Sequence, residues 1–253
     1  MPRPELLEQA FAAGSSFLVR WQLPEGNFRY MYDWITGTWV EDDHQVRQAG
    51  SLWGIGTCYR YKPDEATRAA LDKGLQFWFR NTIPGPAEGP LSMRYPGDPT
   101  IHSGSVALVA LAIIEYLEAD APMDKAYRTE LNQKLDGYLA FLQWLQLPDG
   151  HIARDFHHGR SKRSPRSSPY YDGESLLALG KKTEAIELLE ASILLAHDRG
   201  EFMPRDAMCD LLKEYGIEPP VLTSTEDTDA IEAGAFVCKR CRKARPGLDE
   251  PPF

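Results

Sequence analysis

Apolar residues recur every three or four positions along most of the first 200 residues, which is the period of an amphipathic helix. Segment 102–118 is almost wholly apolar and predicts a buried helix. Segment 124–147 keeps the amphipathic pattern until Pro148, which cannot continue a helix. Further helices are predicted over 4–22, 41–61, 64–81, 171–181, 183–198 and 204–215. Strand-like alternation is sparse, at 28–32 and 91–95, so we predict an all-α fold with short β excursions in its loops.

Two motifs repeat along these helices. Residues 17–28 (FLVRWQLPEGNF) resemble residues 141–152 (FLQWLQLPDGHI), and each reads as a helix that ends at a proline, an acidic-Gly turn and a short extended piece. A second motif places a glycine near the start of three apolar helices, at Gly50, Gly104 and Gly173. Small residues at these positions allow helices to approach closely. Three helix–loop–helix units are therefore predicted to stack around a common axis.

The helical order ends after about residue 200. Prolines, a Thr/Ser/Asp-rich run and a basic stretch at 239–245 follow. We predict a helical domain over 1–216 and an irregular tail over 217–253.

Composition narrows the classes of partner. The formal net charge of −9 argues against a nucleic-acid binder, which needs a basic face for phosphates. No stretch approaches about 20 apolar residues, so no membrane span is expected. The N-terminus enters an amphipathic helix and lacks the apolar core of a signal peptide, which predicts a cytoplasmic protein. No P-loop, dinucleotide fingerprint, nucleophile elbow or His-Glu-x-x-His motif occurs, and no cofactor is expected.

The four cysteines leave one alternative open. Cys238 and Cys241 form a C-x-x-C pair, which supplies half of a zinc site. Cys209 or a histidine would complete that site in a zinc protein. The preferred interpretation is reduced thiols and no bound metal.

Three segments carry a resemblance to a known superfamily. They are 26–33 (GNFRYMYD), 42–53 (DDHQVRQAGSLW) and 168–179 (SPYYDGESLLAL). With the repeated units, they resemble the α/α-toroids of the six-hairpin glycosidase type, and more closely an uncharacterised bacterial toroid family. The resemblance covers roughly residues 1–182 and implies a toroid of helical hairpins.

The chain departs from that pattern in the number of hairpins. A complete toroid has about six, whereas three clear units and one degenerate unit are visible here. The resemblance therefore implies an incomplete ring, whose open side a second copy or another partner would cover.

The resemblance also implies one cleft, where helix N-termini and hairpin loops meet. Asp43 and Glu174 are the predicted acid and base. The predicted binding residues, several of them aromatic rings suited to stacking on sugars, are Tyr30, Tyr32, Asp42, His44, Arg47, Gln48, Trp53, His102, Tyr170, Tyr171 and Asp172.

Several of these residues have an alternative structural interpretation. Asp42 and Asp43 also suit a helix cap, and Arg47 and Gln48 suit local pairing with Asp43. Trp53 suits the core, and the pair Tyr170-Tyr171 suits loop packing. Glu174 is less expected on structural grounds, because it opens an apolar helix.

Two functions follow from the predicted cleft. The first is a carbohydrate-active protein, hydrolase or epimerase, that binds a sugar or a uronic-acid glycan. The alternative is a non-catalytic glycan- or peptide-binding or scaffold protein of the same fold. A basic loop containing His157, Lys162 and Arg166 is interpreted as a solvated surface, with anion binding as its alternative.

Overall fold

The computed structural model describes residues 4–180 and, beyond them, separate short stretches at 190, 193–194, 197, 205–206, 208–209, 213, 218–220, 236–238 and 243–245. The chain forms two compact units, Met1–Ala185 and Ile186–Phe253. The first unit carries the helices and the candidate site.

The first half of that unit contains three helices and a hairpin. Its elements are α1 (Pro4–Arg20), β1 (Met31–Asp33), β2 (Thr38–Val40), α2 (Gln45–Tyr61) and α3 (Glu65–Arg80). Strands β1 and β2 pair antiparallel, with Tyr32 opposite Trp39. Helix α3 begins where the Asp64 side chain accepts a hydrogen bond from the backbone N–H of Thr67 at 2.8 Å.

The second half surrounds helix α4. Its elements are β3 (Thr82–Pro84), β4 (Leu91–Met93), β5 (Thr100–His102), α4 (Ser103–Glu118), α5 (Lys125–Leu145), β6 (Asp155–His157), the 3-10 helix η1 (His158–Arg160), β7 (Lys162–Arg163) and α6 (Pro169–Ala178). Strand β3 pairs antiparallel with β4. Strand β6 lies between β5 and β7 in a three-stranded antiparallel sheet.

The second unit contributes one described strand pair, β8 (Phe236–Cys238) with β9 (Lys243–Arg245). The predicted helices over 183–198 and 204–215 and the predicted boundary at residue 216 lie largely outside the described residues. Cys241 of the zinc alternative lies outside them as well.

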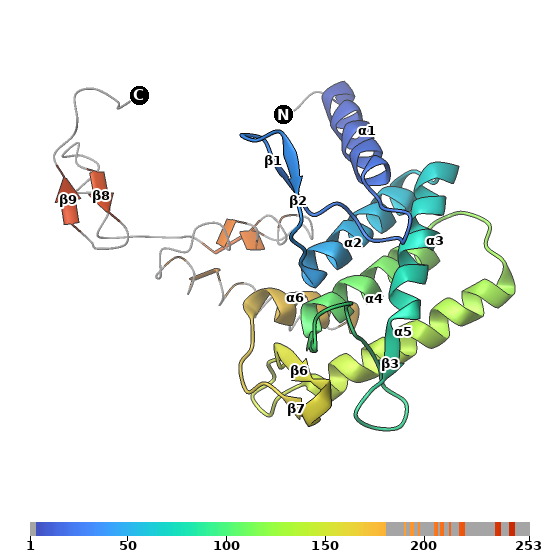
Figure 1. The fold of residues 1–253 in the computed structure, drawn as a ribbon, viewed down its shortest axis with the longest axis vertical. Coiled ribbons are helices and arrows are strands. Elements are labelled where there is room, and N and C mark those ends of the chain that lie inside the picture. The colour runs from blue at the N-terminus through green and yellow to red at the C-terminus, as the bar shows by residue number, and fades with distance from the viewer. Residues whose placement is uncertain are drawn as a thin grey trace. The chain divides into compact units, whose positions relative to one another are not determined.

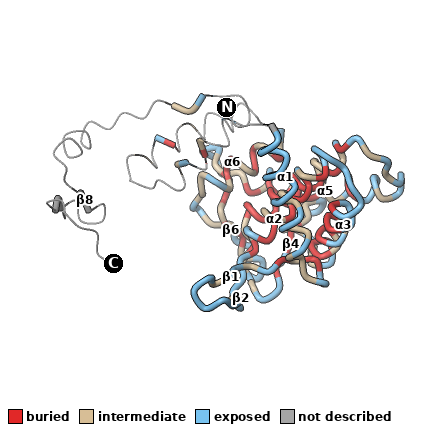
Figure 2. The backbone as a smooth tube through the Cα atoms, turned by 90° about the horizontal axis from the view of Figure 1, so that it is seen from above, coloured by how far each residue is buried: buried red, intermediate tan, exposed pale blue. Residues whose placement is uncertain are grey.

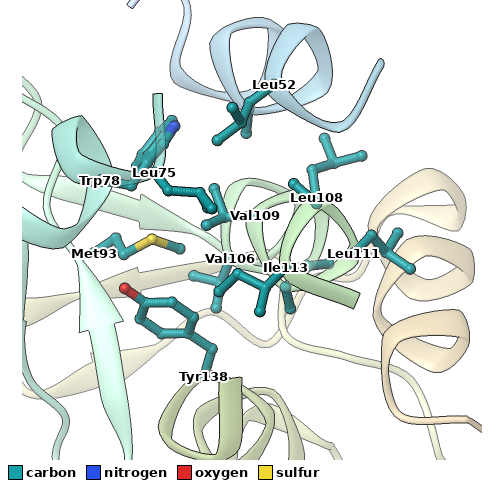
Figure 3. Close-up of a cluster of buried hydrophobic side chains, with 14 of the residues drawn as sticks. Leu52, Leu75, Trp78, Met93, Val106, Leu108, Val109, Leu111, Ile113 and Tyr138 are labelled. Carbon is teal, nitrogen blue, oxygen red and sulfur yellow. The ribbon is translucent and has the colours of Figure 1, made fainter. Parts of the chain in front are cut away.

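Helix α4 forms the centre of the core. It packs against α2, α5 and α6 (Figure 1), and ten of its residues from Ser103 to Ala112 are all buried. Figure 2 shows buried backbone among α2, α3, α5 and α6, while α1 and the β1–β2 hairpin are largely exposed. In Figure 3, Leu52 of α2, Trp78 of α3, Met93 of β4 and Tyr138 of α5 converge on the apolar side chains of α4.

The apolar period predicted most helices of the first unit to within a few residues. The main difference is at α2, which begins at Gln45 rather than at residue 41. Acidic residues 41–43 precede the helix, and His44 is its N-cap. Helix α6 begins at Pro169, two residues before the predicted start, because proline suits the first helical position.

The two copies of the proline-containing motif form matching sets of hydrogen bonds. The Gln22 side chain donates to the carbonyl of Gly26 at 3.1 Å, and Gln146 donates to Gly150 at 3.0 Å. Isolated bridges pair Gln22 with Phe28 and Gln146 with Ile152. Both motif glycines have positive φ values, 107° at Gly26 and 90° at Gly150, a backbone conformation that favours glycine. The sequence similarity between the motifs therefore corresponds to the same local structure.

Within the part of the chain that is described, no helix combines the length and apolar character needed to cross a membrane.

Candidate functional site

The N-terminal ends of α2, α4 and α6 bring chemically active side chains together. The N-cap residues are His44, His102 and Ser168, and none of the three side chains caps its helix by a hydrogen bond. By contrast, aspartate side chains cap α3 and α5. The ends of α2, α4 and α6 thus present partial positive charge that no N-cap side chain neutralises.

At this end of the helices, the His102 ring contacts the carboxylate of Asp155. Its Nδ1 atom lies 2.6 Å from Oδ1 of Asp155, on the neighbouring strand β6. The other ring nitrogen, Nε2, lies 4.0 Å from Asp98 Oδ2, beyond hydrogen-bond distance. A carboxylate on Nδ1 favours the tautomer in which Nδ1 carries the proton and Nε2 is the basic nitrogen. The pair has the geometry of a histidine acid–base oriented by an aspartate.

Asp155 is held in its ionised form. Burial by itself raises the pKa of this carboxyl, but hydrogen bonds from Arg154 and His102 outweigh burial and lower the pKa below its ordinary value. Arg154 donates from Nε at 2.8 Å, and its Nη2 lies 2.7 Å from the same oxygen, Oδ2. Asp155 therefore places a negatively charged carboxylate against Nδ1 of His102.

Two aromatic rings lie beside His102. The His44 ring stacks on it, with 5.9 Å between ring centroids and 6° between ring planes. The Tyr171 ring lies 6.1 Å from it on the side of α6. Tyr171 packs so closely on α4 that a Cβ atom at Gly104 would lie 2.4 Å from its Cδ1. A glycine at position 104 is thus required for the contact between Tyr171 and the start of α4.

A buried amide fixes the strand that carries His102. Gln45 is 2% exposed, and its Nε2 donates to Asp98 Oδ2 at 2.8 Å and to the carbonyl of Thr100 at 2.9 Å. Its Oε1 accepts from the Ser105 hydroxyl at 3.0 Å. The first residue of α2 therefore holds β5 and α4 in place around His102.

Glu174, a predicted acid, lies one turn into α6. Its Oε2 atom is buried and has no hydrogen-bond partner among the residues that the structure describes. Burial raises the pKa of this carboxyl from 4.5 to about 8. Burial also raises the pKa of Tyr171 to about 12, with further increases from the charges of Glu174 and Asp155. Both Glu174 and Tyr171 therefore carry their protons at neutral pH.

Asp43, the other predicted acid, belongs to a hydrogen-bond network before α2. Its Oδ1 accepts from Gln48 Nε2 at 2.6 Å and from the backbone of His44 at 2.8 Å. Its Oδ2 accepts from the hydroxyl of Tyr95. Burial raises the pKa of Tyr95, and the hydrogen bond to Asp43 raises it further. Both oxygens of Asp43 are thus committed to protein donors.

Gln48 and Asp172 have equivalent roles on α2 and α6. Gln48 Oε1 accepts from the backbone N–H of Phe28 at 2.7 Å, and Asp172 Oδ1 accepts from that of Ile152 at 2.6 Å. Asp172 also lies 3.0 Å from His151 Nδ1. Burial raises the pKa of Asp172, and the hydrogen bond with His151 opposes that increase. These two side chains attach the proline-containing turns to the helices.

The remaining predicted residues lie around the cluster or away from it. Trp53 packs against the core and donates to Glu115, near the other end of α4, at 3.4 Å. Tyr32 is 51% exposed and packs on Trp39 in the β1–β2 hairpin. The others are the half-buried Tyr30 and the exposed Asp42, Arg47 and Tyr170.

The structure adds residues that the sequence did not suggest. Asp155, Arg154 and Gln45 contact or position His102, and none was a candidate. Asp155 is 53 positions from His102 in sequence. The pairing of β5 with β6 brings them together, and strands this short leave no alternation that predicts it.

No known family model matches the chain, and neither does any curated protein sequence. Among solved structures, the chain is similar to the crystal structure of D-mannose isomerase, with a TM-score of 0.54 and 17% sequence identity. The match covers 74% of this chain and 50% of that chain, so the chain spans half the length of the structure it matches. At this identity the similarity is one of fold: a helix-rich domain with short strand pairs.

Proposed function

We propose that the chain is a sugar-converting protein of the isomerase or epimerase type, in which His102 transfers a proton at a carbon next to the sugar carbonyl. The observation that carries this proposal is the contact between His102 Nδ1 and the buried Asp155, at 2.6 Å. It leaves Nε2 as a base at a place where three helices begin. The fold similarity to part of an enzyme named D-mannose isomerase is consistent with sugar chemistry.

The proposed reaction begins with the transfer of one carbon-bound proton. His102 Nε2 removes the proton from the carbon beside the carbonyl, and the C–H electron pair forms a carbon–carbon double bond. Negative charge then develops on the carbonyl oxygen. In isomerisation, the hydroxyl proton on the carbon that lost its hydrogen passes to the former carbonyl oxygen, and the carbon-bound proton returns to the former carbonyl carbon. In epimerisation, a proton returns to the opposite face of the carbon that lost it.

The surroundings of His102 suit that developing charge. The uncapped N-termini of α2, α4 and α6 favour negative charge nearby. Glu174 and Tyr171 hold protons at neutral pH and are proposed as donors to the sugar oxygens. His44, stacked on His102, is proposed to bind the sugar.

Proton transfer fits this geometry better than hydrolysis by two carboxylates. A glycosidase of that type needs one carboxyl free to act as a nucleophile or base opposite the acid. Asp43 was one of the two carboxyls predicted for acid–base work, but each of its oxygens accepts a hydrogen bond from the protein. We propose Asp43 as an organiser of the loop before α2.

We also propose that the helical unit is an arc of an α/α-toroid. The match to half of the isomerase chain and the matching turns at Gly26 and Gly150 support this arrangement. In such an arc, the ends of α2, α4 and α6 form one wall of the sugar site.

Solvent-hydrogen exchange tests the function directly. The protein is incubated in D2O with a panel of aldoses and ketoses, and loss of the proton beside the carbonyl is followed by NMR. Exchange is expected with at least one sugar and should fall by about 100-fold or more in His102→Asn. His158→Asn is the matched control, because the His158 ring lies against Phe156, whose side chain belongs to the core. Absence of exchange with every sugar, or equal exchange in His102→Asn, contradicts the proposal.

A further inference from the structure

The sheet that carries Asp155 has a second chemical feature, a concentration of positive charge. Between Arg154 and Arg166 the chain holds five Arg and Lys residues and one acid, Asp155, although its formal net charge is −9. Asp155 is already paired with Arg154 and His102. The charge of this segment is thus opposite to that of the chain as a whole.

Strand register places part of this charge on the face of the sheet that carries the His102–Asp155 pair. His102 lies opposite Asp155, and His157 lies opposite both Thr100 and Lys162. Side chains alternate between the two faces of a strand, so His157 shares a face with Asp155, two positions away. Lys162, directly across from His157, belongs to that face as well.

The opposite face of the same sheet is used for packing. Ile101 and Phe156 are both fully buried. Arg163, across from Phe156, donates to the carbonyls of Trp144 and Gln146 and lies over the Trp144 ring. Arg163 thus has a structural role, whereas Lys162 is exposed.

Two arginines extend the positive charge beside Asp155. The Arg154 side chain turns toward Asp155 and is 43% exposed. The backbone N–H of Arg154 donates to the carbonyl of Arg166 at 2.7 Å, and Arg166 is exposed. We call Arg154, His157, Lys162 and Arg166 the basic rim.

On the side of His102 where His44 stacks, the residues just before α2 are acidic. Glu41, Asp42 and Asp43 are exposed just before α2. An anionic ligand is therefore repelled on that side and attracted by the basic rim.

We infer that the sugar carries a compact anionic group, carboxylate or phosphate, that binds the basic rim while its carbonyl end faces His102. This inference rests on the proposed function and specifies its substrate class. Arginine and lysine together suit such a group, because guanidinium binds oxyanions in pairs of hydrogen bonds and ammonium binds them as a point charge.

Binding measurements on the full-length chain test the inference separately from turnover. Isothermal titration compares D-glucuronate and D-mannuronate, glucose 6-phosphate and mannose 6-phosphate, the neutral parent sugars, and inorganic phosphate. We expect one anionic class to bind roughly tenfold or more tightly than the neutral sugar and than inorganic phosphate. Whichever class does so identifies the group as carboxylate or phosphate.

The matched variants have the same net charge. Lys162→Ala/Arg166→Ala removes two cations from the rim, and Lys73→Ala/Lys125→Ala removes two exposed cations from α3 and α5. The rim variant is expected to lose roughly tenfold or more in affinity for the anionic sugar and little for the neutral one, while the control binds as wild type. Circular dichroism verifies that both variants fold.

The outcomes separate the two proposals. Equal binding of neutral and anionic sugars, inorganic phosphate binding as tightly as the anionic sugar, no binding of any anionic sugar, or unchanged binding in the rim variant overturns the inference. Hydrogen exchange that depends on His102 but occurs only with neutral sugars overturns the inference and leaves the proposed function intact. Tight rim-dependent binding of an anionic sugar without hydrogen exchange leaves the assignment of the anionic group intact and overturns the proposed function.

Discussion

The Glu174→Gln substitution should change how the free energy of unfolding depends on pH, because it removes a buried carboxyl. Burial raises the pKa of this carboxyl from 4.5 to about 8, and within the described part of the chain Oε2 has no hydrogen-bond partner. The folded chain therefore holds the proton more tightly than the unfolded chain. The resulting stabilisation is complete below about pH 4.5 and is lost as the pH rises through about 8.

The magnitude follows from the size of the shift. One pKa unit corresponds to about 1.4 kcal/mol. Raising the pH from 6 to 9 should then lower the free energy of unfolding of the wild type by about 2–3 kcal/mol through Glu174 alone. Glutamine has nearly the same shape and does not ionise, so the variant lacks this contribution.

Urea unfolding followed by circular dichroism at pH 6 and pH 9 measures the effect. The wild type should lose about 2–3 kcal/mol more than Glu174→Gln over this interval. Glu130→Gln, at an exposed position on α5, should behave as the wild type. If wild type and Glu174→Gln respond equally to pH, Glu174 is not held protonated and cannot act as the proposed proton donor.

Two further substitutions test the packing around the site, each by urea unfolding at pH 7. Gly104→Ala places a Cβ 2.4 Å from the Tyr171 ring, so it should lower the free energy of unfolding by about 1–3 kcal/mol and displace Tyr171 from His102. An unchanged free energy of unfolding would mean that the ring moves freely. Gln48→Ala leaves the N–H of Phe28 unpaired in the interior and should lower the free energy of unfolding by about 1–3 kcal/mol. The control is Trp34→Ala, at a side chain that is 81% exposed, and its free energy of unfolding should stay within about 0.5 kcal/mol of that of the wild type.

The helices of the first unit were predictable because their burial is periodic. Segment 102–118 was predicted to be a buried helix, and α4 is the centre of the core. The start of α2 was predicted wrongly, because residues 41–43 have the composition of a first helical turn. They precede the helix instead, and Asp43 binds Gln48 and Tyr95.

The candidate site was predictable only where a residue lies in a recognisable motif. His102, Tyr171 and Glu174 belong to helix starts that the sequence marks, and they lie at the helix ends described above. Asp155 and Gln45 have no such signal in the sequence. Asp155 reaches His102 only because β5 pairs with β6, and Gln45 acts through its hydrogen bond to the carbonyl of Thr100. Strands of three residues, such as β5 and β6, are too short for alternation to predict their register.

The central claim is that His102 and Asp155 transfer a proton as one unit, and a double-mutant cycle on the hydrogen-exchange rate tests it most directly. The rates are measured in wild type, His102→Asn, Asp155→Asn and the double variant, with the sugar that exchanges fastest. We predict that each single change lowers the rate by about 100-fold or more, and that the double variant is no slower than His102→Asn. The claim would be contradicted if the double variant lost the product of the two single rate losses. It would also be contradicted by an Asp155→Asn rate close to that of the wild type.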